Sequence, residues 1–296
     1  MSVKFVNLIQ CRSVSTLTEK EEDLFWYSDQ WLMEPVFFGI RYQCLISKGV
    51  RFLGQKEEYK ETNKLNLIES ISEYFRVNLF PDDTLFEGYL TFDGNKKDAY
   101  SFLKSFVVEE SLKKKAIFYI TDILYYNGTD IFNMPLFDRK NLLKKIVNES
   151  ENVRLQQGYS KNKKQVFEQL KDRFKVFLFK DYCARYSFKQ SVACRIYKVS
   201  VSYYMIVMGA VSNEDEKYKG MVVALEGGQY KNGILEKIMN VPVHNNDSRI
   251  KLYDRRKEIE GKIFEIHALE KTNENKYQDA RFVCMRNNKT SSDCIF

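Results

Sequence analysis

Residues 33–53 read MEPVFFGIRYQCLISKGVRFL, and this stretch decides how the chain is interpreted. Its second half predicts a strand at about 38–47, a two-residue Lys-Gly turn, and a second strand at about 50–56. Its first half places Val36 and two phenylalanines immediately before a glycine and an arginine. The stretch therefore predicts a strand pair that is preceded by a short apolar segment, residues 36–38.

The composition is that of a globular protein. Apolar residues make up 44% of the 296 residues, and only 4 Pro and 13 Gly argue against a disordered chain. This length is enough for one large domain or two ordinary ones. Lys and Arg exceed Asp and Glu by seven (47 against 40), which permits a phosphate-rich partner without requiring one.

The six cysteines show no paired C-x-x-C spacing and there are only two histidines, which argues against a zinc site. Unpaired cysteines within strand-like runs predict buried thiols in a reducing compartment. No apolar run approaches the ~20 residues of a membrane span, and the N-terminal segment is too polar for a signal peptide. The sequence predicts a soluble intracellular protein, nuclear or cytoplasmic, with no membrane partner.

Helical and strand-like patterns are mixed along the chain, and several strands are joined by tight turns. This mixture predicts an antiparallel α+β architecture rather than a series of parallel βαβ units. The predicted helices are 18–27, 65–77, 98–112, 139–147 and 162–174, and further predicted strands are 84–94, 116–128, 175–179, 194–208, 220–226 and 233–239.

A polar stretch at 241–260 predicts a linker between two domains. Two strand-like segments, 261–268 and 280–286, follow it and are typical of a small β-domain. We therefore expect a larger domain at 1–240 and a smaller one at 241–296.

Six ordered segments between about 31 and 289 resemble the motifs of the covalent nucleotidyltransferase superfamily. This superfamily comprises messenger-RNA capping guanylyltransferases and ATP-dependent DNA ligases. Its members link a nucleotide from GTP or ATP to a lysine with the help of a divalent metal, and pass it to a 5′-phosphorylated end. The resemblance implies a nucleotidyltransferase-like (ATP-grasp-like) domain followed by a reduced, OB-fold-like β-barrel domain.

The first and third motifs carry the most informative departures. The first motif, Lys-x-Asp-Gly-x-Arg, aligns with VFFGIR, in which Gly39 and Arg41 match. Val36 stands at the nucleophile position and Phe38 at the aspartate position. In the third motif, Asp-Gly-Glu, the final glutamate is replaced by Tyr89.

The later motifs are matched in part. TDILYYNG at 121–128 fits closely, although threonine stands where an aromatic residue would stack on the base. Lys219 occupies the acidic position of the fourth motif, and Lys237 is the one retained lysine of the fifth. In the sixth motif, Arg286 and Lys289 remain.

These departures predict a catalytically inactive protein. The valine at position 36 cannot attack a phosphorus atom. Phe38, Tyr89 and Lys219 supply no carboxylate for a metal. The resemblance therefore implies no catalytic residue and no metal site, and leaves as residual nucleotide- or phosphate-binding residues Gly39, Arg41, Lys237, Arg286 and Lys289.

Three functions stay open. The first, favoured by likeness of 39–59, 174–182 and 280–293 to capping enzymes, is an inactive guanylyltransferase-like protein acting as an RNA-end-binding or accessory subunit in 5′ capping. The second is a degenerate DNA-ligase-like protein with a DNA-binding or structural role. The third is an active nucleotidyltransferase with a relocated lysine. Partners implied are RNA or DNA 5′ ends, or an active capping or ligase component. No cofactor is expected, and GTP or ATP with magnesium applies only to the third function.

Two further expectations concern side chains. Strand alternation predicts that Val36 and Phe38 share one face, while Phe37 points the other way. We expect Val36 and Phe38 to lie in the former nucleotide cleft of the superfamily (the old cleft), which apolar groups would fill. Basic clusters at 113–115, 161–164 and 255–257 are candidates for a nucleic-acid path, although each is also typical of a solvated surface.

Overall fold

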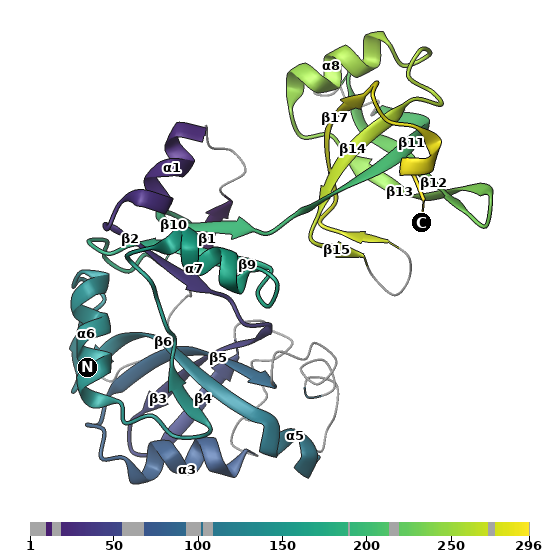
Figure 1. Cartoon of the computed structure of the whole chain (residues 1–296). Coiled ribbons are helices and arrows are strands. Elements are labelled where there is room, and N and C mark those ends of the chain that lie inside the picture. The colour runs from purple at the N-terminus through teal and green to yellow at the C-terminus, as the bar shows by residue number, and fades with distance from the viewer. Residues whose placement is uncertain are drawn as a thin grey trace. The chain divides into compact units, whose positions relative to one another are not determined.

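The structure, a computed structural model, describes residues 10–13, 19–54, 68–92, 102, 109–188, 190–212, 219–271 and 276–295. The chain divides into two compact units, Met1–Tyr197 and Lys198–Phe296, and each is described by itself (Figure 1).

The larger sheet of the N-terminal unit runs in the order β4-β3-β5-β6-β7, with β8 beside β6. All of its pairs are antiparallel except β6 with β8. The predicted strand pair is confirmed as β3 and β4, and its turn places Lys48 and Gly49 at φ 51° and 132°. The strands are β3 Gly39–Ile46, β4 Val50–Gly54, β5 Thr84–Phe92, β6 Ala116–Tyr126, β7 Thr129–Asp130 and β8 Val153–Leu155.

A second, four-stranded sheet of this unit runs in the order β1-β10-β9-β2. Its β2 and β9 are antiparallel, whereas β1 and β10 are parallel. The connection from β2 to β3 therefore joins the two sheets directly. The strands are β1 Gln10–Ser13, β2 Trp31–Pro35, β9 Val176–Asp181 and β10 Gln190–Lys198.

Five helices of the N-terminal unit are described: α1 Glu19–Tyr27, α3 Glu69–Val77, α5 Glu110–Lys115, α6 Leu136–Ile146 and α7 Lys163–Leu170. Four of them match the predicted helices in place, with shifted ends, whereas α5 overlaps the predicted helix at 98–112 only at residues 110–112. Of the predicted helix at 98–112, only Phe102 and the residues from 109 onward are described. In α3 the buried residues Ile71, Tyr74 and Phe75 recur at helical spacing, so the helix packs that face on the sheet.

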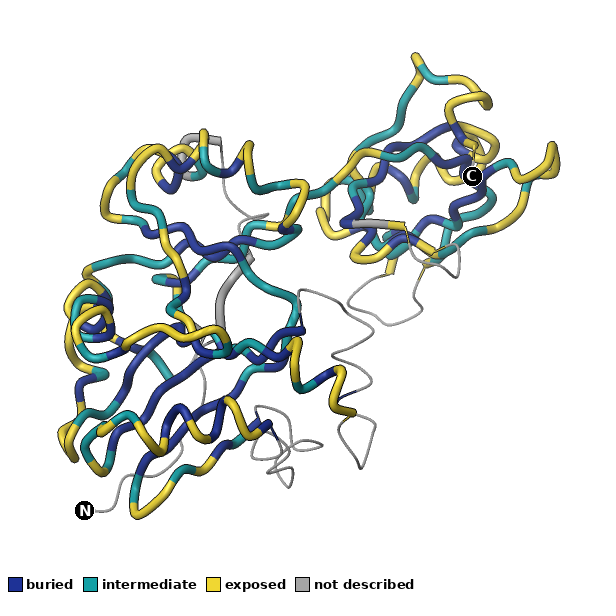
Figure 2. Tube along the Cα trace, turned by 60° about the horizontal axis from the view of Figure 1, so that its bottom comes forward, coloured by how far each residue is buried: buried dark blue, intermediate teal, exposed yellow. Residues whose placement is uncertain are grey.

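The main core of the N-terminal unit lies on one face of the larger sheet. Alternate residues of its strands face this core, for example Ile40, Tyr42 and Cys44 of β3. Phe75 packs there against Phe52, Phe86 and Phe118, with ring centroids 5.7–5.9 Å apart. Figure 2 shows the buried strands of this sheet. The opposite face of the larger sheet carries the polar side chains described in the next subsection.

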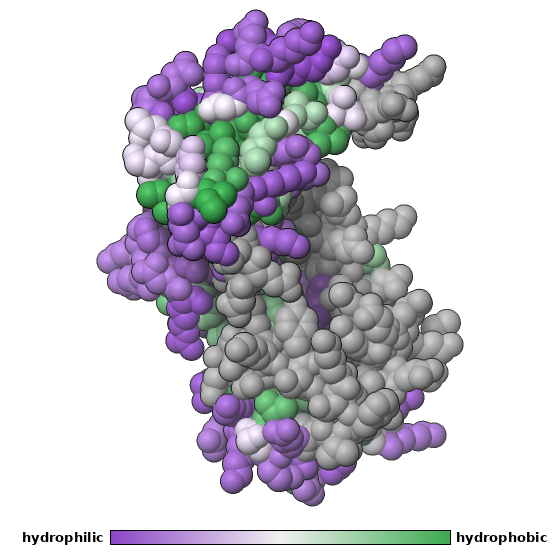
Figure 3. All heavy atoms as spheres, turned by 90° about the vertical axis from the view of Figure 1, so that its right-hand side faces the viewer, coloured by the Kyte–Doolittle hydropathy of each residue, from purple (hydrophilic) through white to green (hydrophobic). Residues whose placement is uncertain are grey.

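The C-terminal unit is built on a sheet in the order β13-β12-β11-β14-β17, with all neighbours antiparallel. Its core includes Met205, Leu225, Leu252, Phe264 and Ile266. Figure 3 shows an apolar area on this unit surrounded by polar side chains. The elements are β11 Val201–Ser212, β12 Val222–Lys231, β13 Ile234–Pro242, α8 Asn246–Asp254, β14 Ile263–Ala268, β15 Glu270–Lys271, β16 Tyr277–Gln278, β17 Arg281–Arg286 and the 3-10 helix η4 Ser291–Asp293.

The division between the units differs from the predicted boundary at 240/241. The single strand predicted at 194–208 is two strands, β10 and β11, which belong to different sheets. Because β11, β12 and β13 pair with one another and β11 pairs with β14, they belong to the C-terminal unit. The predicted linker at 241–260 contains α8, which is polar because its residues, apart from Leu252, are not buried.

The cysteines depart from the expectation of unpaired thiols. Cys194 is disulfide-bonded. Cys44 and Cys294 are free and buried, Cys183 is free and exposed, and Cys284 is free and half-buried. No helix in the described part of the chain is long and apolar enough to span a membrane.

Candidate functional site

Residues 36–38 form the connection between β2 and β3, where the two sheets of the N-terminal unit meet. The Val36 backbone N–H donates to the Val176 carbonyl at 2.9 Å, which fixes the connection to the start of β9. The predicted nucleophile position is therefore a structured part of the chain, and its side chain is an isopropyl group.

Phe37 and Phe38 have different surroundings. Phe37 stacks on Tyr119 of β6, with ring centroids 4.1 Å apart and planes 12° apart. Phe37 also forms a T-shaped contact with Phe174, with ring centroids 4.9 Å apart. Phe38 packs instead against the main core. Phe38 therefore faces the core side of the sheet, contrary to the expectation that it would fill the old cleft with Val36.

Arg41 of β3 is held by Glu87 of β5, on the face of the sheet opposite the core. Its Nε donates to Glu87 Oε1 at 2.8 Å and its Nη2 contacts the same oxygen. The Tyr186 hydroxyl donates to the other carboxylate oxygen. Burial alone would lower the pKa of Arg41, but the attraction of Glu87 outweighs it and raises that pKa. The arginine is charged and already has an anionic partner.

A second buried pair joins β6 to α6. Arg139 donates twice to Asp122, from Nε at 2.8 Å and from Nη2 at 2.9 Å. Burial would raise the pKa of Asp122, but Arg139 keeps it below its ordinary value. The neighbouring Thr121 hydroxyl donates to the Glu87 carbonyl at 3.1 Å. The threonine at the predicted base-stacking position therefore joins β6 to β5 within the sheet.

Glu34 of β2 lies between two lysines. Lys140 of α6 contacts one of its carboxylate oxygens, and Lys180 of β9 contacts the other at 2.8 Å. Burial would raise the pKa of Glu34, but the two lysines together keep it low. Burial lowers the pKa of Lys140 despite Glu34, whereas Glu34 and Asp122 outweigh burial at Lys180 and raise its pKa.

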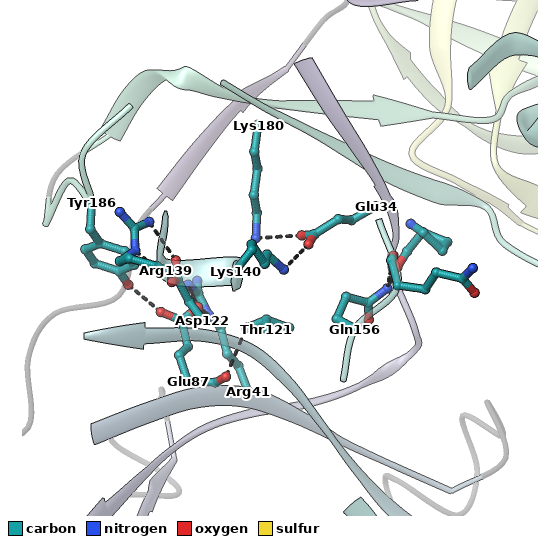
Figure 4. Close-up of polar contacts among 12 residues, drawn as sticks. Glu34, Arg41, Glu87, Thr121, Asp122, Arg139, Lys140, Gln156, Lys180 and Tyr186 are labelled. Atoms are coloured by element: carbon teal, nitrogen blue, oxygen red, sulfur yellow. Dashed lines mark hydrogen bonds and ion pairs between the residues drawn. The ribbon is translucent and has the colours of Figure 1, made fainter. Parts of the chain in front are cut away.

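Figure 4 shows these pairs as one row of charges, with Tyr186 near Glu87 at one end and Gln156 at the other. Gln156 donates from its side chain to the Pro35 carbonyl at 3.0 Å and from its backbone to the Ile120 carbonyl at 2.9 Å. The row therefore ties α6 and the strands of the smaller sheet to the polar face of the larger sheet. We call these seven residues the cleft charge row: Glu34, Arg41, Glu87, Asp122, Arg139, Lys140 and Lys180.

The cleft charge row does not fit a catalytic metal. A divalent metal in this chemistry needs carboxylates to bind it. Each of the three carboxylates, on Glu34, Glu87 and Asp122, is instead engaged by basic side chains. No group of three potential metal ligands occurs among the residues that the structure describes.

Two other predicted positions of the N-terminal unit have structural partners. Tyr89 lies in β5 in register with Arg41 on one side and Tyr119 on the other. A Cβ atom at Gly39 would lie 2.4 Å from the Leu90 carbonyl oxygen, so the close approach of β5 alone requires this glycine.

The remaining predicted positions belong to the C-terminal unit. Lys219 is exposed. Lys237 pairs with Glu226, Arg286 with Glu265, and Lys289 with Asp293. All four basic residues proposed for phosphate binding, including Arg41, thus have a carboxylate partner within the chain.

Sequence reasoning missed most of the cleft charge row. Arg139 and Lys140 fall in a predicted helix, Glu34 and Lys180 fall outside the predicted strands, and none of the four was assigned a role at the site. A charged residue within an apolar strand, such as Glu34 in WLMEP, was the available signal, because a buried charge needs a partner. The partners themselves come from distant segments and had no sequence signal.

Known proteins resemble this chain in part of its sequence and in its fold. Residues 89–175 match the family described as ATP dependent DNA ligase domain. No curated protein matches the chain. The solved structure titled "Pmar-Lig_PreS3" is similar over 96% of this chain and 68% of its own, with 15% identity and a TM-score of 0.67.

Two further structures show the same fold. One is titled "DNA binding with a minimal scaffold: Structure-function analysis of Lig E DNA ligases"; it has 15% identity and a TM-score of 0.63, over 96% of this chain and all of its own. The ligase domain of LigD from M. tuberculosis has 14% identity and a TM-score of 0.52, over 98% of this chain and 97% of its own.

The predicted fold class is confirmed: antiparallel sheets with helices in a nucleotidyltransferase-like unit, together with an OB-like β-unit. The matched family and these structures support the superfamily resemblance and favour its DNA-ligase branch over its capping branch.

Proposed function

We propose that this protein is a DNA-binding factor with a ligase fold that does not form a covalent nucleotide adduct. The observation that carries the proposal is the structure of residues 36–38, the segment that aligns with the reactive lysine of the superfamily. Val36 provides no amine, and Arg41 nearby is neutralised by Glu87. The segment is also fixed by the Phe37–Tyr119 stack, so it presents a packed aromatic group where the superfamily presents a reactive lysine.

Two findings support DNA as the partner. Residues 89–175 match a DNA ligase family, and a structure with the same fold is titled for its DNA binding. The formal net charge of +7 suits a polyanion. The basic clusters contribute unequally, because Lys163 is buried and donates to the Ser28 and Ser160 carbonyls at 2.8 Å.

A second candidate, an active transferase with a relocated lysine, has one observation in its favour. The amines of Lys140 and Lys180 both lie at Glu34, two residues before Val36 in the sequence. Both are held in buried ion pairs, and an ammonium group is not a nucleophile. We therefore favour the inactive protein.

Labelling separates the two candidates. The purified protein is incubated with α-³²P-labelled ATP or GTP and magnesium, and then run on a denaturing gel. We expect no label with either nucleotide. A label that Lys140→Met or Lys180→Met removes would establish the relocated lysine, and labelling by GTP alone would return the protein to the capping branch.

DNA binding is tested separately with fluorescein-labelled duplexes, intact, nicked and with a single-stranded gap, by fluorescence anisotropy at several salt concentrations. We expect binding that weakens as salt rises, because phosphate contacts release counterions. Failure to bind any of these DNAs at low salt would refute the proposed function.

A further inference from the structure

The stack of Phe37 on Tyr119, next to the position where the superfamily has its lysine, is part of a larger aromatic group. Phe37 contacts both Tyr119, in a parallel stack with ring centroids 4.1 Å apart, and Phe174, in a T-shaped pair with centroids 4.9 Å apart. Phe37 and Tyr119 are half-buried, so part of each side chain remains open to solvent. These three rings stand on the side of the larger sheet opposite its main core.

Two exposed arginines flank the rings. Arg154 of β8 is in register with Tyr119 of β6, so both side chains leave the same face of the sheet. Their neighbours Val153 and Phe118 face the core, which agrees with this alternation. The Arg173 guanidinium lies 5.3 Å from the Phe174 ring centroid.

These arginines differ from the basic residues of the cleft charge row. Arg41, Arg139, Lys140 and Lys180 each meet a carboxylate. Among the described residues, neither arginine beside the rings forms a salt bridge. Their charge is therefore available to an anionic partner.

Aromatic faces beside unpaired arginines match the chemistry of a single nucleic-acid strand. In a duplex the base faces stack on each other, whereas an unpaired base offers its face to a protein ring. The phosphates on either side of that base would meet the arginines. A peptide or a lipid surface would use the arginines but would have no need of stacked rings.

We infer that the aromatic platform, Phe37, Tyr119, Phe174, Arg154 and Arg173, binds an unpaired stretch of DNA. One base stacks on the partly exposed pair Phe37 and Tyr119, which the buried Phe174 supports, and the flanking phosphates contact the two arginines. This inference rests on the proposed DNA binding and specifies the form of the strand that is bound. It gives the segment that lacks the catalytic lysine a binding role.

The test compares variants in binding a fluorescein-labelled oligo(dT) of about 12 nucleotides, within the usual site size for such binding. Phe37→Ala should weaken binding about 5- to 150-fold, the effect of losing one stacked base. Phe37→Trp should restore it. A 2-aminopurine base within the strand should be quenched by the wild type and less by Phe37→Ala.

Arg154→Gln and Arg173→Gln test the phosphate contacts. Each should reduce the slope of log affinity against log salt by about 0.7, the value for one phosphate of a single strand. The matched controls are Phe137→Ala, which removes an exposed ring that packs on Tyr182, and Arg76→Gln, which removes an exposed arginine paired with Glu73. Both controls should bind within about twofold of the wild type.

The outcomes separate the inference from the proposed function. Equal binding by Phe37→Ala and wild type, or an equal loss in Phe137→Ala, would overturn the platform while duplex binding still supports the DNA-binding factor. No binding to any DNA would overturn both. Tighter binding to oligo(U) than to oligo(dT) would overturn DNA as the ligand. If Phe37→Ala fails to fold, the arginine variants and Phe37→Trp decide the question.

Discussion

Replacement of Arg139 by methionine should destabilise the N-terminal unit strongly. Arg139 and Asp122 are 2% and 4% exposed, and two hydrogen bonds join them. The variant keeps most of the side-chain volume but leaves the Asp122 carboxylate buried without its partner. Removal of one member of a buried ion pair costs about 3–5 kcal/mol of unfolding free energy.

The loss should depend on pH. In the folded wild type the pKa of Asp122 is lowered, because Arg139 outweighs the opposing effect of burial. The pair therefore stabilises the fold above the unfolded pKa of about 3.9, and this contribution is lost as the pH falls through the folded value. In Arg139→Met burial dominates and raises the pKa of Asp122. The deficit relative to wild type should thus be largest near pH 7 and should shrink towards pH 4, as Asp122 takes up a proton.

Tryptophan fluorescence during urea unfolding measures the unfolding free energy of the N-terminal unit, which contains the Arg139–Asp122 pair. Both tryptophans, Trp26 and Trp31, lie in the N-terminal unit and contact Phe179 and Phe25, respectively. The control is Arg76→Met, which breaks an exposed pair with Glu73 and should cost below about 1 kcal/mol at any pH. A loss below about 1 kcal/mol in Arg139→Met, or one that is constant from pH 4 to 7, would refute the reasoning.

Three other changes test separate features. Val36→Lys should remain unlabelled by ATP or GTP with magnesium, because the carboxylates of Glu34, Glu87 and Asp122 are already paired with basic side chains. Efficient labelling would show that the other replaced positions do not matter. Lys163→Met should lower the unfolding free energy by about 1.5–3 kcal/mol, because the Ser28 and Ser160 carbonyls lose a charged donor. The control is Lys164→Met on the surface, which should leave the urea midpoint unchanged. Gly88→Ala should cost about 1–3 kcal/mol, because the new methyl group would lie 2.5 Å from the Tyr119 carbonyl oxygen; an unchanged midpoint would contradict that contact.

The sequence predicted the local elements of the N-terminal unit well. Apolar alternation and the Lys-Gly turn were sufficient to place β3 and β4, because a hairpin is a short-range feature. The ordered motifs were sufficient for the fold class. Helix α3 was also predictable, since its buried residues recur at helical spacing.

The unit division and the charged site were not predictable in the same way. A strand pattern that continues through Lys198 gives no sign that β10 and β11 enter different sheets. A polar run is produced equally by a linker and by an exposed helix such as α8. The partners of Glu34 lie 106 residues away at Lys140 and farther still at Lys180, so only the tertiary structure brings them together.

The structure also gives a physical reason why some motif positions match the superfamily and others do not. Arg41 has a carboxylate partner inside the chain, and Gly39 is required by the approach of β5. Both matching residues therefore contribute to the fold whether or not a nucleotide binds. Val36 stands in the connection between the sheets, where only its backbone makes a described hydrogen bond.

A lysine at position 36 is thus not needed to hold the connection between β2 and β3. Loss of Arg41, in contrast, would leave Glu87 buried beside Tyr186 without its cationic partner. The matching residues alone do not indicate catalysis, because structural need accounts for them. Function must instead be sought where basic side chains have no carboxylate partner. Among the described residues of the N-terminal unit, the arginines of the aromatic platform meet that criterion, whereas the basic residues of the cleft charge row do not.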